Sequence, residues 1–182
     1  AGRHAQAVAA FDQVLKSTND YEMAFNARLN MALEDAAASG SALAAKESLE
    51  KMLKDIKNLE YKDQIYFALA EIALESGNRE EAIRNLELSL EHSRSNTIQK
   101  AESYYTLAGL YFEADDYVKA KNYYDSTLLV MPGSDERIAE AKRLAENLTD
   151  VAKNLQVIVE QDSLLKISAM SPKERAEMAA RI

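Results

Sequence analysis

Alanine, a bulky apolar residue and leucine recur along the chain in a fixed frame that appears four times. The bulky residue lies four positions after the alanine and the leucine eight positions after it, which places all three on one face of a helix. The four alanines, Ala7, Ala45, Ala82 and Ala120, are 38, 37 and 38 residues apart. Five positions before them stand the turn residues Gly2, Gly40, Gly77 and Asp115. A second amphipathic stretch precedes three of these turns, so the pattern predicts repeats of helix, turn and helix.

The unit at residues 101–134 has the clearest motif. It is 34 residues long and carries Tyr104, Leu107, Ala108, Tyr111, Ala120, Tyr124, Thr127 and Pro132. In these positions it resembles a tetratricopeptide repeat. Residues 63–96 follow the same pattern but have Arg94 in place of the closing proline, and residues 26–59 are a divergent copy. Residues 1–25 are a half repeat, because no first helix precedes the Ala7 face, so we expect a fragment of a longer array.

The resemblance implies an all-α fold, a right-handed tetratricopeptide solenoid that forms one continuous domain over residues 1–134. Only five glycines and two prolines interrupt the chain, and no flexible linker divides it. Residues 135–182 differ, because apolar steps of three and four residues predict one long amphipathic helix from Asp135 onward. We expect its first part, 136–147, to be a capping helix that covers Tyr124 and Leu128 of the last unit.

The rest of the tail is too apolar to be left in water. It carries Val157, Ile158, Val159, Leu164, Leu165, Ile167 and Met170. Ser171 to Glu174 form a capping box with proline at the first helical position, which predicts a further helix at residues 173–181. Three destinations compete for the tail: the chain's own groove, a second copy through self-association of residues 156–182, or a downstream domain. Folding back has the advantage that intramolecular burial has no concentration cost.

Composition and chemistry-bearing residues narrow the function. A net charge of -8 argues against nucleic acid as a partner. No apolar stretch is long enough to span a bilayer, so we expect no direct membrane insertion of this fragment. His4 and His92 lack any motif spacing, and the pair Glu71 and Glu75 is typical of a solvated helix face. With no Gly-rich phosphate loop, nucleophile elbow or cysteine, the sequence predicts no enzyme, no cofactor and no metal site.

The concave surface of the solenoid is the predicted binding site, because the first helix of each tetratricopeptide unit lines it. Counting in frame gives the candidate groove residues Asn30, Glu34, Gln64, Phe67, Glu71, Glu75, Glu102, Tyr105, Phe112 and Glu113. Their acidity favours a basic or apolar segment of a protein or peptide and rejects acidic ones. The basic residues with which related domains clamp chaperone C-termini are missing. An alternative is that the aromatic residues simply pack against adjacent units.

Gly109 lies in the middle of a predicted first helix, where glycine costs about 1 kcal/mol relative to alanine. Something should compensate for that cost. We expect a close contact with a neighbouring helix rather than the approach of a ligand.

A narrower resemblance rests on three short segments of the tail. These are residues 148–155, the Gln161-Asp162-Ser163-Leu164 step, and the Met170-Ser171-Pro172-Lys173-Glu174-Arg175 turn. They are similar to the SprE/PorW family of tetratricopeptide lipoproteins, which is associated with gliding motility and type IX secretion in Bacteroidetes. The resemblance implies a lipoprotein on the periplasmic side of the outer membrane that connects other secretion-system components. The alternative is a sensor or regulatory domain of a larger cytoplasmic regulator.

Overall fold

The chain folds into helices alone over the part that the structure describes. This computed structural model describes residues 2–39 and 41–179, and it leaves out the side chains of residues 2, 3 and 36–39. The helices are α1 (Gly2–Ser17), α2 (Tyr21–Ser39), α3 (Ala42–Lys54), the 3-10 helix η1 (Ile56–Tyr61), α4 (Lys62–Glu75), α5 (Arg79–His92), α6 (Thr97–Glu113), α7 (Tyr117–Val130), α8 (Ile138–Ala169) and α9 (Pro172–Ala179). No strand occurs within residues 2–39 and 41–179. The predicted all-α class is confirmed.

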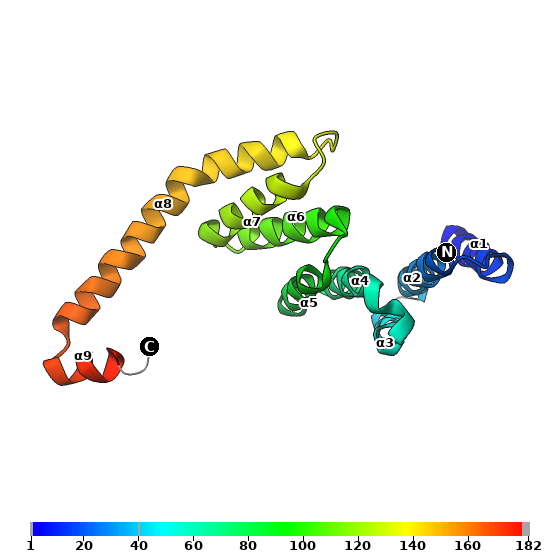
Figure 1. Cartoon of the computed structure of the whole chain (residues 1–182), viewed down its shortest axis with the longest axis horizontal. Helices are drawn as coiled ribbons and strands as arrows, with labels where there is room; N and C mark the ends of the chain where they lie inside the picture. Colours follow the sequence, from blue (N-terminus) through cyan, green and yellow to red (C-terminus); the bar gives the residue numbers. More distant parts are fainter. Residues whose placement is uncertain (1, 40, 180–182) are drawn as a thin grey trace.

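Consecutive helices pack against each other from α1 to α8 and form an elongated, curved array (Figure 1). The pairs α2–α3, α4–α5 and α6–α7 are the three predicted helix-turn-helix units, with α1 before them and α8 after them. Each pair buries its apolar face against the next, which is how a solenoid builds a continuous core from local contacts. The predicted solenoid is therefore confirmed.

The turns within and between units have specific chemical causes. Gly77 and Asp115 adopt φ angles of 72° and 58°, the left-handed conformation that ends α4 and α6. The side chains of Asn78, Asn96 and Asp116 then cap α5, α6 and α7 by accepting a backbone N–H three residues on. Of the other expected turn residues, Gly2 instead begins α1, and Gly40 lies outside the described residues.

The alanine frame marks the closest helix contacts. Ala45, Ala82 and Ala120 are 2%, 0% and 0% exposed, whereas Ala7 in α1 is half-buried. Larger apolar side chains from both neighbours fill the space around each alanine, as when Leu107 of α6 joins Ala82 in one core cluster. A small residue at each of these positions lets the backbones approach, and this explains why the sequence frame locates the units.

The first half of α8 caps the last unit as predicted. Ala141, Ala145 and Leu148 are buried in one cluster with Tyr124 of α7, and Leu128 packs against its edge. These contacts continue the alternation of the repeats with one further helix. The apolar face of α7 is therefore covered rather than left in water.

The second half of α8 leaves the repeats and extends into solvent, where α9 turns back at its end (Figure 1). Its apolar side chains are uncovered, with Val159 64% and Leu165 66% exposed. The Ser171 backbone N–H donates to Glu174 Oε2 at 2.7 Å and confirms the predicted capping box at the start of α9. Part of the helix predicted at residues 173–181, from residue 180 on, lies outside the described residues. One of the three alternatives for the tail was that it folds back onto the chain's own groove. This prediction is wrong for the described part of the tail.

Candidate functional site

The first helices of the three units line the inner side of the curve. Helix α2 contacts α4, and α4 contacts α6, although a second helix lies between each pair in the sequence. No contact of that extent joins α3 with α5 or α5 with α7 within the described segments. Because helices on the inside of a bend lie closer together, α2, α4 and α6 form the concave face. The predicted groove residues all belong to these three helices.

Three of the predicted acidic residues lie close enough to affect one another. The pKa of Glu71 on α4 is raised, first by burial of its carboxylate and then by the negative charges of Glu75 and Glu102. The side chain as a whole remains exposed, so the carboxylate faces solvent from a partly desolvated site. Over the described part of the chain, neither Glu71 nor Glu75 forms an ion pair. These two carboxylates are thus the free negative charges of the groove.

The other predicted acids contact basic side chains. His4 Nδ1 lies 2.6 Å from Glu34 Oε2, and Arg79 Nη1 lies 3.2 Å from Glu113 Oε2. The Arg137 guanidinium binds Glu102 with two hydrogen bonds of 2.8 and 2.5 Å. The groove is therefore less acidic than a count of its glutamates indicates.

Arg137 is a groove-side residue that the frame did not identify, because it lies in the turn before α8 and outside any repeat position. Its guanidinium also bonds Asp135, whose pKa it lowers to about 2, and sits over the Tyr105 ring at 5.2 Å from the centroid. The bonds to both carboxylates raise the pKa of Arg137. The only sequence signal is the Asp135 to Arg137 spacing, which does not reveal the distant Glu102. The residue ties the start of the cap to α6.

The aromatic candidates divide between packing and exposure. Phe67 is half-buried against the core cluster around Ala82. Tyr105 meets Tyr124 edge to face, with centroids 6.1 Å apart. Phe112 also has a neighbour, Tyr117, at 5.8 Å, but it remains 38% exposed. Phe67 and Tyr105 thus pack against neighbouring helices, and Phe112 is the most exposed of the three aromatic side chains.

Gly109 lies one helical turn from Tyr105 and from Phe112. The prediction that a neighbouring helix packs closely against it is wrong. A Cβ added at this position would meet nothing within 4 Å. The glycine instead leaves open space on the inner side of α6.

Asn30 on α2 is exposed, and its side-chain amide donates to the Asn26 carbonyl of its own helix at 2.8 Å.

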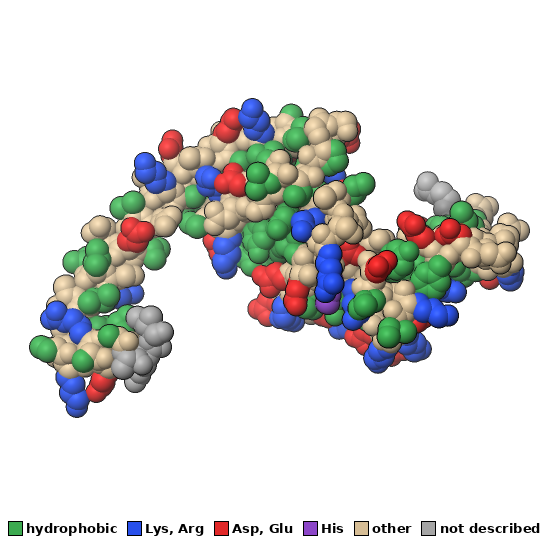
Figure 2. All heavy atoms as spheres, in the orientation of Figure 1, with side chains coloured by type: hydrophobic (Ala, Val, Ile, Leu, Met, Phe, Trp, Pro, Cys, Tyr) green, Lys and Arg blue, Asp and Glu red, His purple; other side chains and the backbone are tan. Residues whose placement is uncertain are grey.

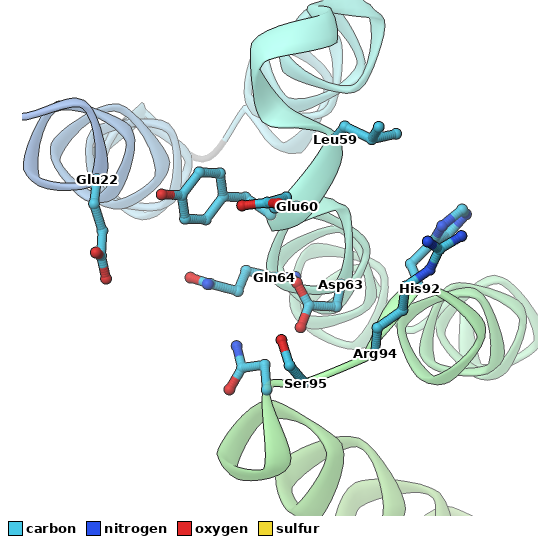
Figure 3. A pocket seen from close by; sticks show the side chains of 10 residues that line it. Glu22, Leu59, Glu60, Asp63, Gln64, His92, Arg94 and Ser95 are labelled. Carbon is cyan, nitrogen blue, oxygen red and sulfur yellow. The ribbon is translucent and has the colours of Figure 1, made fainter.

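Gln64 opens onto a pocket of about 510 Å³ that the sequence did not reveal. We call it the Asp63 pocket; its lining residues are Glu22, Leu59, Glu60, Tyr61, Asp63, Gln64, His92, Arg94, Ser95 and Asn96 (Figure 3). They come from the start of α2, from η1 and α4, from the last residue of α5, and from the turn between α5 and α6. The one sequence signal is a carboxylate in the first turn of α4, which reads as an ordinary dipole-stabilising residue.

The described residues carry none of the arrangements that metal chemistry requires. No group of three or more His, Cys, Asp or Glu side chains among them is placed to hold a metal ion. His92 stacks on Tyr66, with ring centroids 5.2 Å apart, and His4 is engaged by Glu34. None of the helices in the described part combines the length and hydropathy of a membrane span.

Comparison with known proteins agrees with the repeat frame. Residues 63–96 match the family model described as a tetratricopeptide repeat. A solved structure described as the crystal structure of MamA is 21% identical, with 89% of this chain and 92% of that chain covered and a TM-score of 0.51. A second, the crystal structure of MamA protein, is 20% identical, with 93% and 88% covered and a TM-score of 0.50. No curated protein matches the chain. At these identities the likeness shows the fold, which is that of a tetratricopeptide solenoid.

Proposed function

We propose that the chain is a non-catalytic scaffold that binds a polypeptide along the inner face of α2, α4 and α6. The observation that carries this proposal is the combination of free charge and exposed apolar surface on one face. Glu71 and Glu75 form no ion pair within the described residues, and Phe112 is exposed beside the open space at Gly109. A segment with a basic residue and an apolar residue in neighbouring positions would satisfy both features.

The proposal assigns different roles to the apolar and the acidic parts of the groove. The apolar contact at Phe112 would supply most of the binding free energy, because burial of aromatic surface is non-directional and large. The two carboxylates would select basic segments and raise the association rate, since partly exposed charges contribute more to selectivity than to affinity. Glu102 and Glu113 contribute less, because each already has an arginine beside it, and Glu34 contributes less because His4 Nδ1 contacts its carboxylate.

The finer assignment, a periplasm-facing component of a type IX secretion or gliding assembly, is part of the same proposal. It is supported by the resemblance of the tail to the SprE/PorW family, and its partners would be other components of that assembly. The exposed apolar face of α8 fits a chain that works within an assembly. The alternative is a sensor domain of a cytoplasmic regulator, and a lipoprotein signal or a DNA-binding module in the full-length sequence would distinguish the two.

Peptide display on the full chain tests the proposal. We expect selection from a random peptide library to enrich sequences that combine Lys or Arg with an apolar residue. Binding of a selected peptide, followed by fluorescence anisotropy, should weaken about tenfold for Glu71→Gln combined with Glu75→Gln. Glu91→Gln, an exposed change on α5, is the matched control and should have no effect. Enrichment of acidic peptides, or equal binding to both variants, would overturn the groove.

A further inference from the structure

The Asp63 pocket is built from segments that are far apart in the sequence. Glu22 comes from α2, Glu60 and Tyr61 from η1, Asp63 and Gln64 from α4, and Asn96 from the turn before α6 (Figure 3). Its volume of about 510 Å³ exceeds that of any amino-acid side chain and lies in the range of ligand sites. Through Gln64 the pocket adjoins the concave face, since that residue occupies a groove position of α4.

Asp63 is held rigidly at the wall of this pocket. The residue is 1% exposed, and its Oδ1 accepts the Gln64 backbone N–H at 2.9 Å. Its carbonyl accepts the Ser89 hydroxyl at 2.8 Å, which fixes the backbone from the neighbouring α5. Such anchoring fixes the position of the carboxylate at the wall of the pocket.

The second carboxylate oxygen, Oδ2, has no hydrogen-bond partner within the described structure. Burial is the largest cause and raises the pKa of Asp63, whereas the Ser93 and Asn96 side chains lower it as potential donors whose contacts with Oδ2 do not meet hydrogen-bond geometry. The Ser93 hydroxyl is directed to the Asn96 carbonyl at 2.9 Å, and Asn96 Oδ1 accepts the Gln99 N–H at 3.1 Å. A buried acceptor left without a donor is destabilising and therefore calls for a partner.

The charges around the pocket indicate what that partner should be. Glu22 and Glu60 line it with Asp63, and their charges raise the pKa of the Tyr61 phenol, for which burial is the largest cause. The two basic lining residues, His92 and Arg94, extend away from the Asp63 carboxylate toward the opposite side (Figure 3). The side nearest Asp63 is thus negative and offers acceptors, the complement of a cationic donor.

We propose that the Asp63 pocket receives the ammonium or guanidinium group of a lysine or arginine side chain of the bound polypeptide. Asp63 Oδ2 accepts a hydrogen bond from that group, the Gln64 and Asn96 amides flank it, and Glu22 and Glu60 attract it from the rim. The inference rests on the proposed scaffold function and adds a specific anchor beside the groove. A long, flexible side chain reaches such a site while its backbone stays outside.

A titration of the full chain by two-dimensional ¹H–¹⁵N NMR tests this anchor. The probe is the blocked tripeptide acetyl-Gly-Arg-Gly-amide, and its matched control carries citrulline, which has the same shape without the charge. We expect the arginine peptide to shift the backbone amides of Gln64 and Asn96, and the citrulline peptide to bind about tenfold more weakly. Asp63→Asn should reduce the affinity of the arginine peptide about tenfold.

Two further variants keep the result interpretable if Asp63→Asn does not fold. Glu60→Gln lies on the exposed rim and should weaken binding of the arginine peptide about threefold, whereas Glu160→Gln on the exposed second half of α8 should leave that binding unchanged. Equal binding of the citrulline peptide, shifts confined to the surroundings of Glu71 and Glu75, or no shifts at all would each overturn the anchor. None of these outcomes decides the scaffold proposal, which is judged separately by the display-selected peptide.

Discussion

Charged side chains on the inner face differ in what their surroundings leave them free to do. Glu102 is bound by Arg137 on both carboxylate oxygens, whereas Glu71 and Glu75 are exposed, and the charges that raise the pKa of Glu71 are those of Glu75 and Glu102. Asp63 differs again, because it is buried and one of its oxygens lacks a donor within the described structure. The same chemical group therefore serves as a structural link, a selective charge or a candidate anchor, according to its contacts.

At Gly109, alanine should stabilise the chain. An added Cβ meets nothing within 4 Å, so Gly109→Ala gains about 0.5 to 1 kcal/mol of helix propensity without a clash. Gly77→Ala is the contrasting change, because that glycine has a φ of 72° and alanine there should cost about 1 to 2 kcal/mol. Urea denaturation of both variants measures the effects. A destabilised Gly109→Ala would show that a neighbour approaches this position after all.

Burial of Asp63 should make the folded chain less stable as the pH rises. Burial raises the pKa of Asp63 above its ordinary value of 3.8, so the stability linked to this residue is present below pH 3.8 and is lost as pH rises through the pKa of the folded state. We expect Asp63→Asn to raise the urea midpoint at pH 7, and the gain to disappear near pH 3. Asp162→Asn on the exposed tail serves as control. A lower midpoint at pH 7 would mean that the carboxylate has a favourable partner.

Helix α8 has two halves with different roles, although it is one continuous element. Its first half is a cap, with Ala141 and Leu148 buried against α7. Its second half shows apolar residues on the surface beyond the repeats (Figure 2). Local helix propensity carries the element across the boundary, since nothing in its sequence breaks the hydrogen-bonding pattern there.

Substitution of one leucine in each half of α8 tests this difference directly. Leu148 is 5% exposed and Leu165 is 66% exposed. Leu148→Ala should therefore destabilise the chain by about 2 to 4 kcal/mol, and Leu165→Ala by less than about 0.5 kcal/mol. Because the substitution is chemically identical, helix propensity cancels in the comparison. Similar losses in both variants would mean that the second half packs against the repeats in solution.

The junction between α6 and α8 should weaken in acid. Asp135 has its pKa lowered to about 2, first by the Arg137 side-chain hydrogen bond, so its stabilising effect is present above 3.8 and is lost as pH falls from 3.8 toward 2. Asp135→Asn should remove this part of the acid-induced loss. Thermal melts between pH 5 and pH 2 would measure it, and an unchanged acid profile in the variant would show that the pair breaks in solution.

Across the whole molecule, local features of each repeat could be predicted from the sequence, whereas contacts between distant segments could not. The repeat frame locates the units because the helical period and small alanines are local features of each repeat. The repeat frame does not predict the Asp63 pocket, because Glu22, Asp63 and Asn96 come together only after α2, α4 and the α5–α6 turn have packed. For the same reason, the frame does not predict the contact between Arg137 and Glu102. The path of the tail depends on contacts that apolar residues alone do not specify.

Removing the tail should change association rather than stability. Residues 155–179 add little to the core, yet Val157, Ile158, Val159, Leu164 and Leu165 form an exposed apolar face. We expect light scattering to show concentration-dependent self-association of residues 1–182 and a monomer for residues 1–154. The melting temperatures should agree within about 3 °C, because few buried contacts are lost. A large drop on truncation would show that the tail covers the repeats.

The most direct test of the scaffold account is to locate a display-selected peptide on the chain by hydrogen exchange. Amide protection is measured along the full chain with and without the peptide. The account predicts that protection increases on α2, α4 and α6, with the largest change around Glu71, Gly109 and Phe112. Protection confined to α3, α5 and α7, or to the second half of α8, would contradict it and move the interaction site to the outer face or the tail.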